Sequence, residues 1–349
     1  MKYNPALDGI RAVAILMVMC FHAMVPMFWG GYLGVDVFFV LSGFLITSLL
    51  LGETDRTGSI DLGQFYKRRL ARLTPPLVAM LITYLLLARL AWPMVSMRTD
   101  FRDTLIALFY FSDYANAFWS FPENLRHTWS LSVEEHFYLL WPAVILLLLK
   151  LNTPKQRLGV LAAMYVGFSL WRIAWELHGG HSYTQTYYRF DTRLSGLTLG
   201  ALFAFLFHYR LEDKLDHLAS RFTLLPFLIL PLCSRAFNLE SNAAMIVGIP
   251  LVQAATLLLI HASLRRQQGL CFRLLSNPIA TYIGRMSYGL YLWHYPIFRY
   301  MWGRFDWYET LFGGGAIALL LATLSYYTIE RIVRRARARK QEHLALSAT

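Results

Sequence analysis

A single apolar segment near the start of the chain, residues 7–29, contains both an arginine and a histidine. The segment is long enough to span a bilayer, because about 20 apolar residues cover the hydrocarbon. Arg11 and His22 stand close to three helical turns apart, so on a helix they share one face and lie about 16 Å from each other. Ionisable side chains at this depth are costly and usually face a cavity, a partner or a substrate. The segment therefore predicts a reaction or transport site within the membrane.

The composition is that of a membrane protein rather than a soluble domain. Of the 349 residues, 56% are hydrophobic and only 15% are charged, a balance typical of chains with several membrane spans. The net charge of +12 alone would suit a nucleic-acid partner. The basic residues, however, lie between the apolar runs, as the positive-inside rule requires. We therefore expect the lipid bilayer, and no nucleic acid, as a partner.

Cysteine placement predicts neither a disulfide framework nor a metal cluster. The cysteines Cys20, Cys233 and Cys271 fall in separate parts of the chain, without the paired spacing that either would need. No glycine-rich phosphate-binding loop is visible in the sequence. We expect no metal and no permanently bound cofactor.

Long apolar runs divide the chain into about ten predicted transmembrane helices, which gives an all-α, polytopic membrane helix bundle. One further segment, near 101–119, is ambiguous because charged and amide side chains interrupt it. The ten runs are 7–28, 32–51, 75–95, 129–149, 158–175, 193–209, 222–236, 243–263, 279–302 and 311–329.

The placement of lysine and arginine decides how residues 101–119 are expected to lie. If the N-terminus is cytoplasmic and this segment does not cross, most lysines and arginines between spans lie on the cytoplasmic side. If the segment crosses, every later loop changes side and most of them lie outside, against the positive-inside rule. We therefore predict ten spans in the inner (plasma) membrane, both termini cytoplasmic, and 101–119 re-entrant or in the outer interface. Residues 7–29 lack a convincing cleavage site, so we expect them to be retained as an anchor.

Several polar side chains are predicted to converge near the outer ends of their spans. Counted from those ends, the histidines and glutamates lie roughly 8–12 Å below the outer surface. Histidine, carboxylate and hydroxyl groups together in an apolar setting are what acid–base chemistry on a hydroxyl needs. The set comprises His22, Asp36, Ser42, Glu134, Glu135 and His294.

The cytoplasmic side has a different character. Lys67, Arg68, Arg69 and Arg72 stand just before the third predicted span. Residues three apart point the same way on a helix, which applies to Arg69 and Arg72. Guanidinium groups suit bidentate binding of phosphate. The alternative is an ordinary basic cytoplasmic loop, which the positive-inside rule predicts for any such segment.

Structural interpretations of the same residues remain open at this point. His22 could join helices by hydrogen bonding, and Glu134 or Glu135 could pair with arginines to satisfy burial. His294 could belong to an aromatic belt at the membrane surface. Arg172, like two other arginines near span ends, is expected to extend to that surface. Spacing alone does not separate an enzyme from a transporter.

Five motifs, in order and spread over nearly the whole chain, resemble those of the acyltransferase family 3 membrane proteins. The resemblance implies a fold of about ten helices. It also implies transfer of an acyl group, commonly acetyl from cytoplasmic acetyl-CoA, to a hydroxyl of a glycan, a glycolipid or another acceptor, which in many relatives is an envelope polysaccharide. The motifs are residues 7–16 with His22 downstream, 34–46, 65–75, 128–142 and 287–296.

The resemblance assigns roles to individual residues. Arg11 and His22 match the family's arginine–histidine pair with ten residues between them. Arg69 and Arg72 match its Arg-x-x-Arg motif, and Glu134 matches the acid of its Ser-x-x-Glu stretch. By this resemblance, His22 and Glu134 are the expected catalytic residues.

The sequence departs from the family pattern in two respects. Relatives often have an acid shortly after the arginine that matches Arg193, where this chain has Ser195, with Asp191 as a possible substitute. Some relatives also have a fused extracytoplasmic domain. We expect here a membrane acyltransferase domain over 1–335 and a short basic cytoplasmic tail over 336–349, so the acyl group passes directly to the acceptor or to a separate extracytoplasmic acyltransferase.

These roles predict a path for the donor across the membrane. The phosphates of CoA are expected on Arg68, Arg69 and Arg72, and the pantetheine arm is expected to pass Arg11. The arm is needed because about three helical turns separate the two ends of the predicted site.

Two mechanisms and one rival function follow from the buried histidine. His22 takes the proton from the attacking hydroxyl, with Glu134 orienting its imidazole, or it forms an acyl-histidine as the nucleophile. The rival is a proton-coupled transporter in which buried histidine and glutamate relay protons. A transporter of that kind often shows broken helices at matching positions of two halves, and the sequence has no such internal symmetry.

Overall fold

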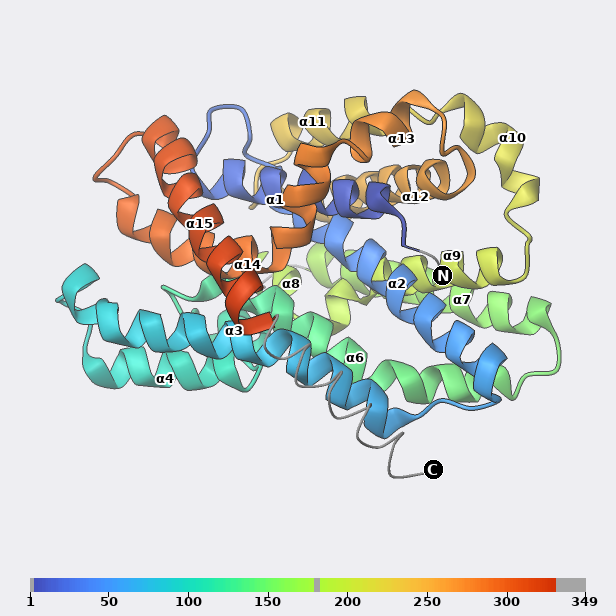
Figure 1. The fold of residues 1–349 in the computed structure, drawn as a ribbon, viewed down its shortest axis with the longest axis horizontal. Coiled ribbons are helices and arrows are strands. Elements are labelled where there is room, and N and C mark those ends of the chain that lie inside the picture. Colours follow the sequence, from blue (N-terminus) through green and yellow to red (C-terminus); the bar gives the residue numbers. More distant parts are fainter. Residues whose placement is uncertain (1–2, 179–182, 331–349) are drawn as a thin grey trace.

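The computed structural model describes residues 3–178 and 183–330, and its regular structure in these ranges is helical throughout, as predicted. Figure 1 shows the order of the helices along the chain. Single 3-10 or π-helical turns precede or follow several of them. The helices are α1 (Pro5–His22), α2 (Gly34–Thr57), α3 (Leu62–Ala91), α4 (Met97–Leu108), α5 (Ser112–Trp119), α6 (Trp129–Leu149), α7 (Pro154–Leu177), α8 (Tyr183–Tyr187), α9 (Phe190–His208), α10 (Asp213–Arg221), α11 (Pro226–Ala236), α12 (Ile249–Arg265), α13 (Leu270–Leu275), α14 (Pro278–Met301) and α15 (Gly315–Ser325).

Each of the ten predicted spans coincides with a helix. Eight helical segments of the described chain are long and apolar enough to cross a membrane. The helix α14, with 24 residues, is equally long, although Arg285, His294 and Arg299 interrupt its apolar sequence. The predicted run 222–236 is shorter in the structure, because turns occupy its first residues and α11 begins only at Pro226. The basic tail after residue 335 lies outside the described residues.

Residues 101–119 form parts of two short helices, α4 and α5, rather than one. At 1.5 Å per residue these helices are about 18 and 12 Å long, too short to cross a bilayer. A break at Tyr110, which has a positive φ of 58°, separates them. Figure 1 shows α4 alongside α3. This agrees with the prediction that the segment does not cross as one span.

Two helix boundaries differ from the prediction in ways that affect the site. The first helix ends at His22, which places this histidine in its last turn. The helix α3 begins at Leu62, where the side chain of Asp61 accepts a hydrogen bond of 2.8 Å from the backbone N–H of Gln64. The basic cluster 67–72, expected before the third span, is therefore part of the helix itself.

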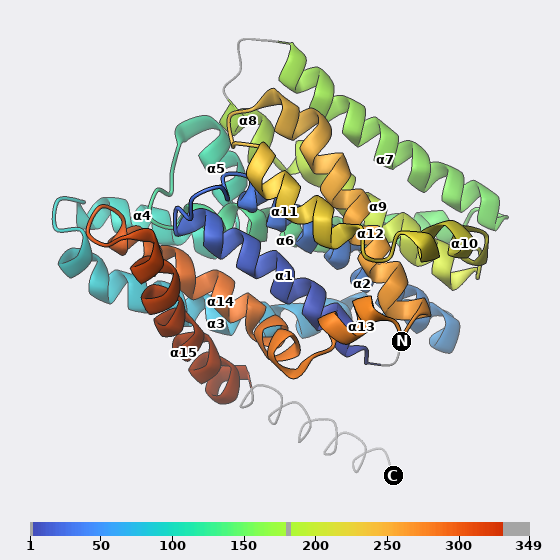
Figure 2. The ribbon, with the colours of Figure 1, turned by 90° about the horizontal axis from the view of Figure 1, so that it is seen from above.

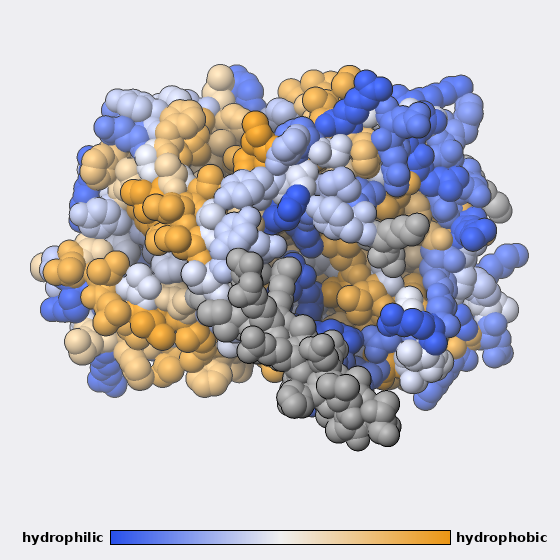
Figure 3. Space-filling model, viewed as in Figure 1, coloured by the Kyte–Doolittle hydropathy of each residue, from blue (hydrophilic) through white to orange (hydrophobic). Residues whose placement is uncertain are grey.

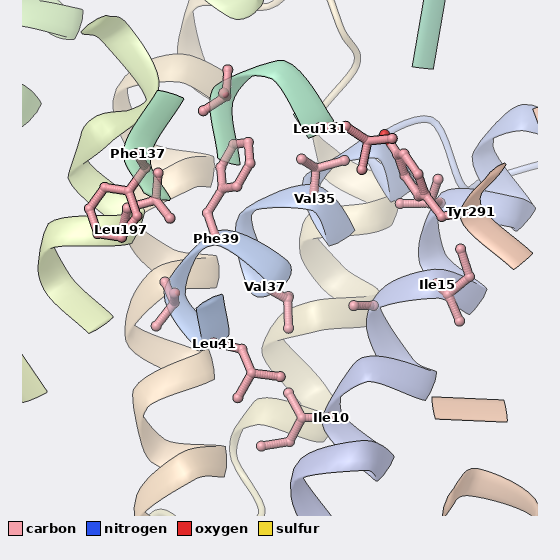
Figure 4. Packing of buried hydrophobic residues seen from close by; sticks show 14 of the residues in the cluster. Ile10, Ile15, Val35, Val37, Phe39, Leu41, Leu131, Phe137, Leu197 and Tyr291 are labelled. Atoms are coloured by element: carbon pink, nitrogen blue, oxygen red, sulfur yellow. The ribbon is translucent and has the colours of Figure 1, made fainter. Parts of the chain in front are cut away.

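At the centre of the bundle, α2 and α9 pack so closely that their backbones touch. A Cβ added at Gly43 would lie 2.0 Å from the carbonyl oxygen of Leu197, and one at Gly200 would lie 2.0 Å from that of Val40. Small residues permit such contacts between membrane helices. Figure 4 shows Phe39 of α2 and Leu197 of α9 in the buried packing around this contact.

Large apolar side chains cover much of the outer surface. Figure 3 shows hydrophobic residues spread over α3, α4 and α15, and hydrophilic residues gathered at the end where α2 ends and α3 begins. Figure 2 shows α7 at the periphery of the bundle. Soluble proteins rarely expose such contiguous apolar area, so lipid is the expected solvent of this face. Exposed examples are Leu86 (74%), Leu90 (80%), Leu147, Leu170 and Leu320.

The α2–α9 contact makes a testable prediction about stability. Gly43→Ala forces the two backbones apart, so we expect a loss of about 1–3 kcal/mol, seen as a lower unfolding temperature in detergent. Gly52→Ala, in the same helix but with no atom within 4 Å of its added Cβ, is the matched control and should not lower that temperature. Equal unfolding temperatures for the native chain and Gly43→Ala would contradict this packing.

Candidate active site

A cavity of about 570 Å³ lies between α1, α2, α3, α6 and α14. Its lining extends along α2 from Val35 to Arg56, about 30 Å at 1.5 Å per residue. A second cavity of about 470 Å³ shares Arg11 and Arg69 with the first, so the two adjoin. The size lies within the usual range for sites that bind small molecules.

One end of the cavity is lined by six arginines, here called the arginine end. They come from the start of α1, the end of α2, and the first halves of α3 and α14. The structure thus brings together the four arginines predicted to bind the donor, and adds two from α2 and α14. Guanidinium groups at this density suit an anionic ligand with several phosphates. The six are Arg11, Arg56, Arg68, Arg69, Arg72 and Arg285.

Contacts with neighbouring side chains hold part of the arginine end in place. Arg11 pairs with Asp8, one turn earlier in α1, at 2.9 Å. Arg68 pairs with Glu53 of α2 at 3.0 Å. The guanidinium carbon of Arg69 lies 3.9 Å from the centre of the Tyr138 ring, a cation–π contact. The arginines outnumber these acids, so the end remains positively charged.

Glu134 lies on the cavity wall and is bound to a hydroxyl. The hydroxyl of Ser42 donates to its Oε1 at 2.6 Å, and the hydroxyl of Tyr138 donates to Ser42 at 3.2 Å. The expectation that Glu134 orients the imidazole of His22 is wrong in this structure. The two residues were predicted to lie at a similar depth in the membrane, but their side chains contact different neighbours. Glu135, half-buried on the same helix, is outside the cavity lining.

His22 is instead joined to His294, and this arrangement, the histidine pair, has a defined protonation pattern. Nδ1 of His22 lies 3.0 Å from Nε2 of His294, and Nδ1 of His294 lies 2.9 Å from the carbonyl oxygen of Leu290. Because a carbonyl only accepts, Nδ1 of His294 carries the proton and its Nε2 accepts. His22 therefore donates from Nδ1, which leaves a lone pair on its Nε2.

A third histidine, His127, lies beside the pair and escaped the sequence analysis. Its ring is buried, stacks on Tyr295 at 4.8 Å between centroids, and lies 5.9 Å from the His294 ring. It precedes the motif at 128–142 by one residue, which is the only sequence signal for it. Within the described chain, no three His, Cys, Asp or Glu side chains are placed to hold a metal ion.

Tyr291 separates the cavity from the histidines. Its ring lines the cavity and lies 5.6 Å from the rings of both His127 and His294. Its hydroxyl lies 2.6 Å from that of Ser130 and 2.9 Å from the carbonyl oxygen of His127. Figure 4 shows Tyr291 beside Leu131, which also belongs to the cavity lining. The cavity therefore ends one aromatic ring away from the histidine pair.

Asp36 and Arg193, two further candidates, pair with each other instead of lining the histidine pair. Nη2 of Arg193 donates to Asp36 at 2.7 Å, and both side chains are buried. Asp191 does not substitute for an acid at Ser195, because it binds Arg189 at 2.5 Å. The pair thus has a structural role that joins α2 to α9.

Two arginines show what sequence position did and did not reveal. Arg285 lines the cavity, and its signal was an arginine in the first half of the apolar run 279–302. Arg172 was expected to reach the membrane surface, but its side chain is fully buried, with 0% exposed. It donates to Ser195 and to the carbonyl of Met245, and these partners draw it into the bundle.

Comparison with known proteins identifies relatives over nearly the whole chain. The family model described as acyltransferase domain matches residues 4–330. O-acetyltransferase OatA of Staphylococcus aureus, from strains NCTC 8325 / PS 47 and COL, is 34% identical over 361 residues, covering 96% of this chain and 58% of the relative. A protein of strain MSSA476, provisionally named as an O-acetyltransferase, is 34% identical over 354 residues, with the same coverage. This chain thus spans little more than half the length of these relatives. No solved structure matches.

The histidine pair predicts an unusual tautomer for His22. We expect the proton on Nδ1 in the native chain, and a shift toward the Nε2–H form, which free histidine favours, in His294→Ala. Nitrogen-15 chemical shifts of labelled histidine in lipid nanodiscs measure this. His127→Ala, which removes a neighbouring ring but no hydrogen bond of the pair, should leave the tautomer unchanged. The same His22 tautomer in the native chain and in His294→Ala would contradict the assignment.

Proposed function

The chain belongs to the acyltransferase family whose model matches residues 4–330, and from this premise we propose that it is a membrane-embedded O-acyltransferase. The donor we propose is acetyl-CoA on the cytoplasmic side, since the relatives are named as O-acetyltransferases. The acceptor we propose is a hydroxyl of an envelope polysaccharide, or of another glycan or glycolipid, on the extracytoplasmic side.

One observation carries the proposal: the cavity connects a cluster of arginines to the neighbourhood of a histidine with a free lone pair. An acyl-CoA has the same division, with phosphates at one end and a thioester at the other. The lining between the two ends includes Leu45, Ile46 and Leu49 of α2, apolar walls that suit an extended, weakly polar arm. The cavity therefore matches an acyl-CoA in its distribution of charge and in its elongated form.

The arginine end provides the donor site in this proposal. Phosphate oxygens accept from guanidinium forks in bidentate fashion, and Arg68, Arg69 and Arg72 present three forks within two turns of α3. Arg11 stands on the way to the histidine pair, about 16 Å before His22 along α1. The thioester would then lie near Tyr291, where the cavity ends.

The histidine pair provides the acid–base chemistry. As the acceptor oxygen attacks the thioester carbonyl, its proton passes to Nε2 of His22, the ring nitrogen that the hydrogen-bond pattern leaves as an acceptor. Collapse of the intermediate breaks the carbon–sulfur bond, and the proton moves from Nε2 to the CoA thiolate. His294 holds the ring by accepting from Nδ1. In the acyl-histidine route the same Nε2 attacks the thioester first.

We also propose an orientation in the membrane. The arginine end faces the cytoplasm, both termini are cytoplasmic, and the membrane is the inner (plasma) membrane. The positive-inside rule supports this orientation, and so does the side on which an acyl-CoA donor is made. If the acyl group is handed on rather than transferred directly, the partner is a separate extracytoplasmic acyltransferase.

Thioester turnover tests the function directly. Purified protein in lipid vesicles receives labelled acetyl-CoA at the arginine end, and CoA release is measured with a glycan acceptor present. We expect His22→Ala to lower kcat roughly 10³-fold, as loss of a general base does. Arg69→Ala/Arg72→Ala should raise KM for acetyl-CoA by roughly 10-fold or more with a smaller change in kcat.

The matched control is Lys155→Ala, an exposed cation on α7 outside the cavity, which should leave both constants unchanged. Turnover that survives His22→Ala would show that this histidine packs between helices and has no catalytic role. No CoA release by folded protein with several acyl-CoA donors and candidate acceptors would favour the transporter.

Cysteine accessibility tests the orientation. In a chain without its native cysteines, Lys155→Cys and Arg304→Cys place single thiols at exposed positions on opposite predicted sides. A membrane-impermeant maleimide added to intact cells should label position 304, and should label position 155 only after permeabilisation. The reverse pattern would invert the proposed topology and, with it, the side of the donor.

A further inference from the structure

Two guanidinium groups are buried together in the bundle outside the cavity. Arg172 of α7 has 0% of its surface exposed and Arg193 of α9 has 2%. Arg172 donates to Ser195, two residues after Arg193 in α9, and Arg193 donates to Asp36 of α2. Buried cations are normally matched by acids, because an uncompensated charge in a low-dielectric interior is strongly unfavourable. The acids around this pair therefore determine whether its two positive charges are compensated.

Within residues 3–178 and 183–330, one carboxylate faces the two guanidinium groups. Asp36 accepts from Nη2 of Arg193 at 2.7 Å. The partners of Arg172 are uncharged: its Nη1 donates to the hydroxyl of Ser195 at 2.6 Å and its Nε to the carbonyl oxygen of Met245 at 3.0 Å. The amide of Gln253 also donates to this hydroxyl, at 3.0 Å. The cluster therefore has an excess of one positive charge.

The remaining acids on these helices do not compensate for it. Asp191 binds Arg189, and Glu176 forms no ion pair with either buried arginine among the described residues. Aromatic rings surround Arg193, with the centre of the Tyr187 ring 4.8 Å from its guanidinium carbon. A cation–π contact attracts a cation but does not neutralise it.

Among the described residues, three buried N–H-bearing atoms of this pair find no hydrogen-bond partner. They are Nη2 of Arg172 and both Nε and Nη1 of Arg193. Guanidinium groups only donate, so the missing partner is an acceptor. Buried polar groups in proteins are almost always satisfied, and here the missing acceptor and the missing negative charge occur in the same cluster.

We propose that Arg172 and Arg193 together bind a small monovalent anion, with chloride as its cellular form. One negative charge balances the cluster, and a halide accepts hydrogen bonds from several directions without needing a donor in return. A phosphate or sulfate carries more charge and its own shape requirements. The bound anion joins α7 to α9, and Arg193 in turn holds the carboxylate of Asp36 in α2, so the anion stabilises the wall of the bundle behind α2.

Chloride dependence of stability tests this site. The full chain, purified in lipid nanodiscs, is unfolded by heat in sodium chloride or in sodium gluconate at equal ionic strength. A ligand that binds only the folded state raises the unfolding temperature with the logarithm of its concentration above Kd. We expect a rise of several degrees in chloride, reproduced by bromide. Equal unfolding temperatures in chloride and gluconate would overturn the proposal.

A pair of matched variants separates charge from shape. Ser195→Asp places a carboxylate at the hydroxyl that Arg172 contacts, so it should replace the anion and abolish the chloride dependence. Ser195→Asn has nearly the same size without the charge, and should keep the dependence. Loss of the dependence in both variants, or in neither, would overturn the proposal.

A direct measurement covers the case in which these variants do not fold. Crystals of the native chain grown in bromide should show an anomalous scattering peak within hydrogen-bond distance of Arg172 and Arg193. A well-ordered cluster without such a peak would contradict the site.

Discussion

The packing of α1 against α14 is the constraint on which the site depends. A Cβ added at Gly284 of α14 would lie 1.8 Å from the carbonyl oxygen of Asp8 in α1, so the two backbones touch near the arginine end. About four turns further along α1, His22 contacts His294 of α14 at 3.0 Å. Figure 2 shows α1 running alongside α14. Because these helices come from opposite ends of the chain, both ends of the site form only once the last third of the bundle is in place.

Two different electrostatic environments lie along the packing of α1 against α14. The arginine end is positively charged and suits an anion, whereas His294 must be uncharged to accept from His22. Tyr291 stands between them, one turn before His294 on the same helix. Binding and chemistry are thereby placed at different depths on a shared wall, and a ligand that uses both must be long and charged at one end only.

The sequence predicted the features that depend on one helix and missed those that depend on its rotation. Hydrophobic runs located the helices, and the spacing of Arg11 and His22 predicted one shared helix face. Arg11 lines the cavity together with Arg285 of α14, and His22 bonds to His294 of the same helix. Depth alone could not reveal that Glu134 binds Ser42 rather than His22, because the direction of a side chain around its helix depends on which helices adjoin it. The burial of Arg172 was unpredictable for the same reason, since its partner Ser195 comes from another helix.

The arrangement of polar groups bears on the choice between enzyme and transporter. A proton relay needs titratable groups in hydrogen-bonded sequence across the membrane. Here Glu134 bonds to Ser42 and Tyr138, and no hydrogen bond of the described residues joins that group to the histidine pair. Between them lies Tyr291, whose hydroxyl is committed to Ser130 and to a backbone carbonyl. Six arginines on the cavity wall would also repel a proton entering from their side, whereas they attract a phosphorylated donor. The geometry therefore favours a site that receives an anion at one end and performs chemistry at the other.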